Sequence, residues 1–570
     1  FDLCKAHGLN PVFAVEGDGK YRADWAWLGG HGSVINPKFN APDGPICTDL
    51  RAAGALLAAS ADYQHSYPHS WRSKAKVIYR CTPQWFVPMD KPLAPSASLR
   101  SAPPPAGEDW NAQNPPPLGE VAAAPAADGG GLTLRQIALA EIARVKFTPD
   151  KGRNRIGSMV EGRPDWVLSR QRAWGVPITL FVNKKSGDYL VDPEVNDRIV
   201  AAVREQGIDA WTPDTAHSFL GDAYNADDWE AVPDILDVWF DSGTSHAYVL
   251  DSGRWPDLSW PADIYVEGSD QHRGWFQSSL LHSCATRGRA PYDQILTHGF
   301  TMDAKGMKMS KSLGNTVDPN KVMETYGADI IRLWALSVDF TEDHRIGDEI
   351  LKGVGDQYRK LRNTFRYLLG ALAGFGEDER VVVADMPELE RYMLHLLASL
   401  DADLRVAAES YDFNTYVRCL SDFCNEDLSA FYFDIRKDSL YCDIGPAAPL
   451  GTPKRRAYRT VLDTLFHALI SYAAPVLVFT AEEVWGTRYP DGGSVHLLEW
   501  PILPHTRHPG PRGGVPLNDE PVYSGTPDQV RGDELVKKWA EIRDSRMLVN
   551  ELIEPMRRAK IIRYSLEPQV

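Results

Sequence analysis

The sequence predicts an α/β region followed by an all-α bundle, on the basis of three observations. A strand pattern at residues 263–266 leads through a polar turn and a helical stretch to a second strand at residues 294–301, as in a parallel α/β sheet. From Asp318 to about residue 490, amphipathic helices follow one another. Between residues 91 and 131, Pro, Ala, Gly and Ser dominate without apolar periodicity, which predicts a disordered segment.

Composition narrows the class of protein. The 570 residues suffice for about three to five domains, and 43% of them are hydrophobic, so packed cores are expected. The formal net charge of −16 argues against a dedicated nucleic-acid coat but leaves room for a local basic patch. Seven scattered cysteines without a Cys-x-x-Cys pair indicate a reducing, cytoplasmic compartment. No apolar run reaches the roughly 18 residues of a membrane span, so no membrane contact is expected.

The sequence divides into six successive segments. Residues 1–90 carry short β-like runs such as residues 76–80, and the disordered insertion occupies residues 91–133. The α/β part is expected at 134–320, a linker at 321–345, the helical bundle at 346–500 and an incomplete junction at 501–570. In such sheets, ligands bind beyond the carboxyl ends of the strands.

Helices are indicated by caps and by apolar spacing. Asp318 followed by Pro319 is a typical helix start. Two apolar sets repeat at helical spacing: Leu389, Met393, Leu396, Leu400 and Leu404, and then Tyr458, Leu462, Leu465, Leu469 and Tyr472.

The sharpest chemical signal is the loop Lys308-Met309-Ser310-Lys311-Ser312. Two lysines three residues apart, in a loop flanked by glycines, can converge on one polyphosphate. Positive charge at the position where negative charge develops on a phosphate lowers a reaction barrier. The alternative is a solvated basic surface loop.

A second signal lies at the end of the first predicted strand. Glu267, Gly268, Asp270 and Gln271 place two carboxylates and an amide where ribose hydroxyls or an ammonium group can donate to them. Gly268 allows a ligand to approach the backbone closely. The alternative is a capped helix in which Trp275 is a core residue.

Together, these two motifs resemble those of the class I aminoacyl-tRNA synthetases, most closely the isoleucyl enzymes. The resemblance implies a Rossmann-type catalytic domain in which Lys308 and Lys311 stabilise the departure of pyrophosphate from ATP. It also implies that the residues at the strand end contact the aminoacyl adenylate. Trp275, and Trp239 in the segment Trp239-Phe240-Asp241-Ser242-Gly243, would line the side-chain pocket. His298 would lie near the adenosine, although a histidine at a strand end is as often structural.

Further segments extend the resemblance. Residues 166–177 resemble the chain's return from the inserted, β-rich editing domain, and Ser169, Arg170 and Arg172 there are expected either to face tRNA or to form ion pairs. Residues 82–87 resemble the exit from the editing domain, and residues 472–485 resemble a helix of the anticodon-binding bundle. Arg359, Arg362 and Arg366 share one helical face, which fits either tRNA phosphates or a solvated surface.

Some features of the family are missing. The His-Ile-Gly-His motif is absent from the 570 residues, and Phe1 opens the sequence without a methionine. We therefore expect a chain truncated at both ends and inactive by itself. Zinc is not supported, because Ser70 and Ser73 stand where some relatives carry a Cys-x-x-Cys half-site, leaving only His65 and His69 nearby.

The expected function is that of an isoleucine–tRNA ligase. It would use ATP with Mg²⁺, L-isoleucine and tRNA(Ile), and act as a monomer when full-length. Two alternatives stay open: another branched-chain synthetase such as the valyl enzyme, and a non-catalytic tRNA-binding remnant of a synthetase.

Overall fold

The computed structural model describes residues 6–9, 14–25, 36–70, 73–80, 84–93, 131–170, 174–311, 313–445, 449–503, 527–559 and 561. Most of the insertion expected at 91–133 lies outside these residues, as does part of the junction expected at 501–570. The chain forms two compact units. Unit 1 comprises Phe1–Arg144, Ile156–Ala262 and Arg273–Pro291, and unit 2 comprises Val145–Arg155, Asp263–His272 and Tyr292–Val570. No helix in the described ranges is both long and apolar enough to cross a membrane.

Unit 1 joins helices to two-stranded antiparallel ribbons. Its α-helices are α2 (Pro37–Asn40), α3 (Pro45–Ala52), α4 (Leu134–Arg144), the second half of α5 (Lys151–Glu161), α6 (Pro193–Gln206), α7 (Val238–Gly243) and α8 (Trp275–Arg287). Strand β1 (Phe86–Val87) pairs with β3 (Trp166–Val167), β4 (Ser169–Arg170) with β7 (Ile235–Leu236), and β5 (Phe181–Asn183) with β6 (Trp229–Ala231). A small core of Phe181, Val195, Ile199, Trp211, Ala216 and Leu220 lies between α6 and the last ribbon.

Helices α7 and α8 pack closely because α7 ends in a glycine. A Cβ at Gly243 would lie 2.9 Å from the backbone carbon of Ser278 in α8. The Gly243 carbonyl accepts a hydrogen bond from Ser279 Oγ at 3.1 Å. Any larger residue at position 243 would push the two helices apart.

The β-like run predicted at residues 76–80 is wrong. Among the described residues of this segment, only an isolated bridge joins His69 and Lys76. Val77 donates its N–H to the Pro68 carbonyl and accepts a hydrogen bond from the Tyr67 hydroxyl. These polar groups are satisfied one by one, so no ladder of strand pairing forms.

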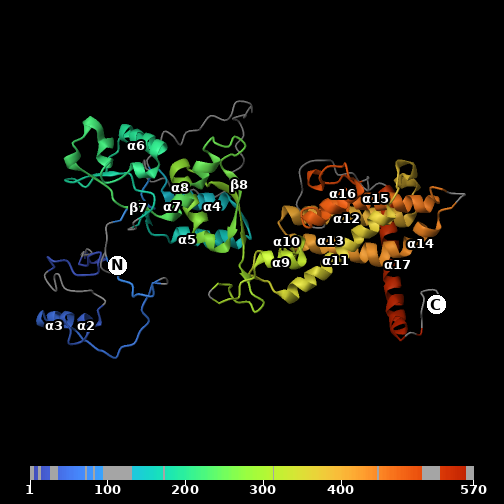
Figure 1. The fold of residues 1–570 in the computed structure, drawn as a ribbon, viewed down its shortest axis with the longest axis horizontal. Coiled ribbons are helices and arrows are strands. Elements are labelled where there is room, and N and C mark those ends of the chain that lie inside the picture. Colours follow the sequence, from blue (N-terminus) through green and yellow to red (C-terminus); the bar gives the residue numbers. More distant parts are fainter. Residues whose placement is uncertain are drawn as a thin grey trace. The chain divides into compact units, whose positions relative to one another are not determined.

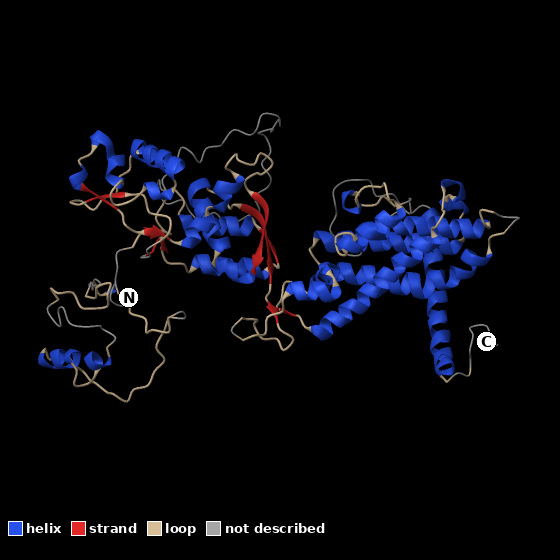
Figure 2. Ribbon diagram, viewed as in Figure 1, coloured by secondary structure: helices blue, strands red, loops and turns tan. Residues whose placement is uncertain are grey.

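Unit 2 begins with a three-stranded sheet in the order β2-β9-β8 (Figure 2). Strand β2 (Lys146–Thr148) runs parallel to β9 (Tyr292–His298), with Lys146 opposite Gln294, and β8 (Ala262–Gly268) is the third strand. The two predicted strands are therefore confirmed, but the second stops at His298. After it, the Gly299 N–H donates to the Phe340 carbonyl, and a Cβ at Gly299 would lie 2.3 Å from the backbone of Glu342. The chain resumes as β10 (Thr301–Met302), which pairs with β11 (His344–Arg345).

The rest of unit 2 is a helical bundle (Figure 1). Its elements are α9 (Pro319–Tyr326), α10 (Ala328–Ser337), α11 (Asp348–Ala371), α12 (Glu388–Glu409), α13 (Phe413–Asp422), the π-helix η9 (Phe423–Phe433), α14 (Asp434–Cys442), α15 (Pro453–Ala473), α16 (Val478–Arg488) and α17 (Pro527–Arg558). The Asp318 cap is confirmed, since its side chain accepts from the Asn320 N–H. Both apolar sets are also confirmed: their members lie in α12 and α15 and pack into one core.

Helix α17 is anchored to the bundle by its first half. Trp539 stacks on Tyr392 with ring centroids 5.9 Å apart, and Arg543 pairs with Asp427 at 2.5 Å. Arg546 pairs with Asp434 of α14 at 2.6 Å, and beyond this residue α17 extends away from the other helices of the bundle (Figure 1). Leu548 and Leu552 on that part are 60% and 74% exposed, so its apolar side is open to solvent.

Candidate functional site

Three of the predicted residues meet at the carboxyl ends of β8 and β9. A Cβ at Gly268 would lie 2.7 Å from Asp270 Oδ1 and 3.6 Å from His298 Cε1. Glu267, Asp270 and His298 are exposed there, and Gln271 donates to Asp270 at 3.4 Å. The arrangement presents carboxylates, an amide and an imidazole around a backbone that only glycine leaves open.

The buried side chain of His272 packs behind this strand end. The sequence analysis did not predict a role for it. His272 is buried and its Nδ1 bonds to the Ser269 carbonyl at 2.7 Å. Burial lowers the pKa of this imidazole, so it stays neutral at physiological pH. Gly152 lies against it, because a Cβ at 152 would be 2.8 Å from His272 Nε2. No sequence signal separates this support from the solvent-facing residues beside it.

The lysine loop follows β10 and folds back on it. An isolated bridge joins Met302 to Lys308, and the Lys308 ammonium lies 5.6 Å from the centre of the Phe300 ring. Lys308 and Lys311 are both exposed, and Met309 packs against the core of the bundle. Phe300 is two residues beyond His298, so Lys308 lies close to the end of β9. Ser310 belongs to the same loop, and Ser312 is outside the described residues.

Asp303 and Asn315 hold this loop, and neither had been assigned a role. Asn315 accepts from the Ser310 N–H at 2.9 Å and donates to Asp303 at 3.0 Å and to the Lys308 carbonyl at 3.2 Å. Asp303 also accepts from the N–H groups of Lys305 and Met307. The hydrogen bond from Asn315 lowers the pKa of Asp303, which keeps it an acceptor. The one available signal was the turn sequence Asp303-Ala304-Lys305-Gly306.

The two predicted tryptophans lie in unit 1. Trp275, the first residue of α8, donates its indole N–H to the Ser242 carbonyl at 2.9 Å and to Ser245 Oγ at 3.1 Å. Its ring is therefore fixed against α7. Trp239 lies on α7 and is 41% exposed, so its face is available to a ligand.

Two polar residues of the segment 166–177 form contacts within the chain. Ser169 is buried and donates to Gln84 at 2.8 Å, while Arg170 pairs with Asp237 at 2.9 Å. The ion-pair alternative is therefore observed for Arg170, while the buried Ser169 hydrogen-bonds within the chain. Arg172 lies outside the described residues.

The arginines of α11 point away from the bundle core. Arg359, Arg362 and Arg366 are exposed, and Arg359 pairs with Asp356 one turn earlier. Leu361 and Phe365 are buried on the other side of the helix. The three arginines are therefore accessible, which is required both for binding tRNA phosphates and for a solvated surface.

No group of three or more His, Cys, Asp or Glu side chains within the described ranges is placed to hold a metal ion. His65 and His69, near the two serines, each bond a backbone carbonyl within the segment.

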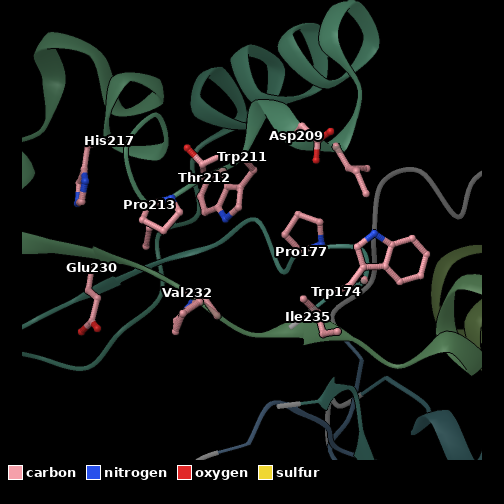
Figure 3. Close-up of a pocket in the computed structure, with 14 residues that line it drawn as sticks. Trp174, Pro177, Asp209, Trp211, Thr212, Pro213, His217, Glu230, Val232 and Ile235 are labelled. Carbon is pink, nitrogen blue, oxygen red and sulfur yellow. The ribbon is translucent and has the colours of Figure 1, made fainter. Parts of the chain in front are cut away.

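Unit 1 also contains a pocket of about 390 Å³ that none of the predicted residues lines (Figure 3). Trp174, Pro177, Trp211 and Ile235 form apolar walls, and Asp209 and Glu230 lie at its edge. The two carboxylates disfavour phosphate groups at this edge of the pocket.

Comparisons with known proteins give two family matches. Residues 121–347 match the model for class I tRNA synthetases (I, L, M and V), and residues 390–560 match the anticodon-binding domain of tRNA ligase. A protein of Zymomonas mobilis named isoleucine–tRNA ligase is 57% identical over all 570 residues, which cover 54% of its length. One of that name from Caulobacter vibrioides is 46% identical, with 100% of this chain and 52% of the relative covered. The chain thus spans about half the length of the curated relatives it matches.

Among solved structures, a leucyl enzyme (LeuRS) of Agrobacterium radiobacter in complex with tRNA and LeuAMS aligns with a TM-score of 0.45 at 19% identity. The alignment covers 61% of this chain and 45% of that one.

Proposed function

The chain belongs to the class I tRNA synthetases, with an anticodon-binding domain after the catalytic part, and we propose that the protein carrying it is an isoleucine–tRNA ligase. The observation that carries this proposal is the 57% identity over the whole chain to a relative with that name. In the reaction, the isoleucine carboxylate attacks the α-phosphorus of ATP. A bond from carboxylate oxygen to phosphorus forms as the bond to pyrophosphate breaks. A ribose hydroxyl of tRNA(Ile) then attacks the carbonyl carbon and releases AMP.

We propose that the lysine loop binds the triphosphate of ATP. Lys308 and Lys311 would hold the phosphates, which arrive with their Mg²⁺, and neutralise the charge that grows on pyrophosphate. The loop residues Met309, Ser310 and Ser312 would contact ATP. The position of Lys308 over Phe300, near His298, supports a nucleotide that extends from the end of β9 into the loop.

We assign the aminoacyl adenylate to the end of β8. The carboxylates of Glu267 and Asp270 would accept from ribose hydroxyls or from the ammonium group of isoleucine, with Gln271 beside them. Gly268 would let the adenylate lie against the backbone. Trp239 and Trp275 would line the pocket for the isoleucine side chain, and the fixed indole of Trp275 supports a rigid wall.

The segment assignments also remain proposals. Residues 1–90 would belong to an editing domain and 134–320 to the catalytic domain, with the linker at 321–345 and the anticodon-binding bundle at 346–500. The protein would act in the cytoplasm as a monomer, and the five cysteines described without a disulfide, Cys47, Cys284, Cys419, Cys424 and Cys442, support a reducing compartment.

Amino-acid-dependent exchange of pyrophosphate into ATP by the full-length protein tests this function. We expect isoleucine to give the highest kcat/KM. A valine preference would identify a valyl enzyme. tRNA(Ile) binding without exchange for any amino acid would identify a non-catalytic remnant.

A further inference from the structure

One segment of unit 1 lies along a single face of α8. It runs from the end of α7 through the π-helix η5 (His246–Leu250). The α8 residues Trp275, Ser279 and His282 all contact this segment. Their spacing of four and then three residues places them on one side of the helix. The proposed reaction uses only the tryptophan of this row.

Four contacts join the segment to α8, and they follow the same order on both elements. They are Trp275 with Ser242 and Ser245, Ser279 with Gly243, His282 with His246, and Arg287 with Asp251. The segment cannot shift along α8 without breaking several of these contacts. Trp239 lies one turn before Ser242 on α7, so both tryptophans of the proposed isoleucine pocket are at the first end of the row.

The histidine pair is the third contact of the row. His246 is fully buried, and its Nε2 lies 3.0 Å from Nδ1 of the partly buried His282. Burial lowers the pKa of both imidazoles, so both are neutral and one ring donates an N–H to the nitrogen of the other. The Phe240 ring of α7 meets the His282 ring edge to face, with centroids 5.4 Å apart. His282 therefore contacts both α7 and η5.

This hydrogen bond determines how the His246 ring is oriented. Its other nitrogen, Nδ1, has no hydrogen-bond partner among the residues that the structure describes. Removing the His282 nitrogen would leave a buried imidazole without any such partner, which costs more than one hydrogen bond contributes. Ser245 directly precedes His246, and its Oγ accepts from the Trp275 indole at 3.1 Å. A rotation at His246 would therefore move a group that holds the indole.

We infer that His246 and His282 are positioning residues that set the selectivity of the isoleucine pocket. The inference rests on the proposed function, in which Trp239 and Trp275 line that pocket. The pair fixes α7 and η5 along α8, and the serines of the segment then hold the indole against which the isoleucine side chain packs. Small shifts of this wall matter, because the single methylene that distinguishes isoleucine from valine gives only about tenfold to two-hundredfold discrimination.

The test measures ATP–pyrophosphate exchange by the full-length protein, with isoleucine and with valine as substrates. His246→Leu should raise the KM for isoleucine about fivefold or more, the scale for a lost buried hydrogen bond. It should also lower the ratio of kcat/KM for isoleucine to that for valine. The KM for ATP and the kcat should stay within about twofold of the parent, because the wall acts on binding of the amino acid. His282→Leu should match it, and the double variant should add nothing further.

Amide variants separate the hydrogen bond from packing. Glutamine at 246 places its amide near the position of Nε2, and asparagine at 282 places its amide near that of Nδ1. His246→Gln and His282→Asn should therefore keep the parent's KM for isoleucine. His282→Gln, whose amide lies one bond further out, should raise this KM, and it replaces a leucine variant that does not fold. Equal KM values for the leucine and amide variants would overturn the inference.

Arg287→Gln is the matched control, because it breaks the last contact of the row, away from the tryptophans. It should keep the parent's KM for isoleucine even where its Tm falls. An equal rise of KM in Arg287→Gln and His246→Leu would indicate general loosening of unit 1 and would overturn the inference, as would leucine variants with the parent's KM. A parent without isoleucine-dependent exchange would contradict the proposed function and, with it, the inference.

Discussion

At the scale of single residues, the two lysines of the loop differ in their surroundings. Lys308 lies over the Phe300 ring and Asn315 holds its carbonyl, whereas Lys311 is exposed at the turn of the loop. Within the described ranges, no side chain pairs with the Lys311 ammonium, and such a flexible ammonium can follow charge as it moves from ATP to pyrophosphate. We therefore expect Lys311 to act mainly in the transition state.

This expectation gives the first prediction. In the full-length protein, Lys311→Ala should lower the rate of isoleucine-dependent ATP–pyrophosphate exchange by about a hundredfold or more, the scale for losing one transition-state contact. Lys308→Ala should act in the same direction, more weakly. Lys305→Ala, an exposed lysine of the preceding turn, is the matched control and should retain the rate. A rate within threefold of the parent for Lys311→Ala would remove this lysine from the mechanism.

A histidine pair in unit 1, of which His246 is fully buried and His282 partly buried, gives a prediction on acid stability. His246 Nε2 and His282 Nδ1 are 3.0 Å apart, and Arg287 and Asp251 form an ion pair beside them. Burial lowers the pKa of His246 from 6.5 to about 3, with smaller contributions from His282 and Arg287. Burial, together with Arg287, lowers the pKa of His282 from 6.5 to about 4. Below pH 6.5, these two histidines bind protons in the unfolded chain but stay neutral in the folded unit. The free energy of unfolding should therefore be highest above pH 6.5 and fall as the pH drops toward 3.

Calorimetric melts at pH 7.5 and pH 5 check this prediction. The Tm of the parent should drop between the two values, and the drop should be smaller in His246→Leu/His282→Leu. His7→Leu, which changes an exposed histidine, should behave as the parent. A double variant with the parent's full drop would show that other groups govern the acid response.

At the scale of elements, the lysine loop depends on the pair Asp303 and Asn315. Asn315→Asp removes the donor to Asp303 and to the Lys308 carbonyl and brings two carboxylates together. Exchange should fall about tenfold to a hundredfold, since losing positioning hydrogen bonds costs about 1–3 kcal/mol. Adding Asp303→Asn restores a donor facing an acceptor and should recover part of the rate, with an unchanged Tm throughout. No recovery in the double variant would argue against a positioning role for the pair.

The bundle contains a buried ion pair between α12 and α14. Glu390 is fully buried and accepts from Arg436 Nε at 2.6 Å and Nη2 at 2.7 Å. Arg436→Met should lower the free energy of unfolding by about 3–5 kcal/mol, because a carboxylate stays buried without its partner. Glu390→Leu/Arg436→Met should lie close to the parent.

Urea denaturation followed by helical circular dichroism measures these values. Lys538→Met, which breaks the exposed pair with Glu388, should cost less than about 1 kcal/mol. A double variant as unstable as Arg436→Met would show that the ion pair itself stabilises the bundle.

At the scale of the whole molecule, the sequence predicted those features that local periodicity determines. Helices α12 and α15 follow from their apolar spacing, the start of α9 from Asp318, and β8 from its apolar run. Features that depend on residues distant in sequence were missed. Position 299 must be glycine because Glu342 lies against it, and Asn315 has its role through Asp303. The run at 76–80 has strand composition, but no strand pairs with it in the part of the chain that the structure describes, so composition alone misled. The site residues were chosen by family resemblance, and the structure brings Gly268, Asp270 and His298 together without testing their roles.

The last prediction concerns the 570 residues as they stand, which should not catalyse isoleucine-dependent ATP–pyrophosphate exchange. Adenylate formation needs ATP held on both sides of the α-phosphate, in line with the attacking carboxylate. The sequence supplies the lysine loop and the strand-end residues, but it contains no His-Ile-Gly-His motif for the other side.

The bundle should nevertheless fold, since a continuous core extends from α9 to α16. The described sheet has only three strands, and Val266 on β8 is 51% exposed, so self-association through the sheet is expected. The purified chain should thus show strong helical dichroism, concentration-dependent association and no exchange. Adding a segment that carries a His-Ile-Gly-His motif, by fusion or in trans, should restore exchange. Robust exchange by the chain alone would mean that the proposed division of the active site is wrong.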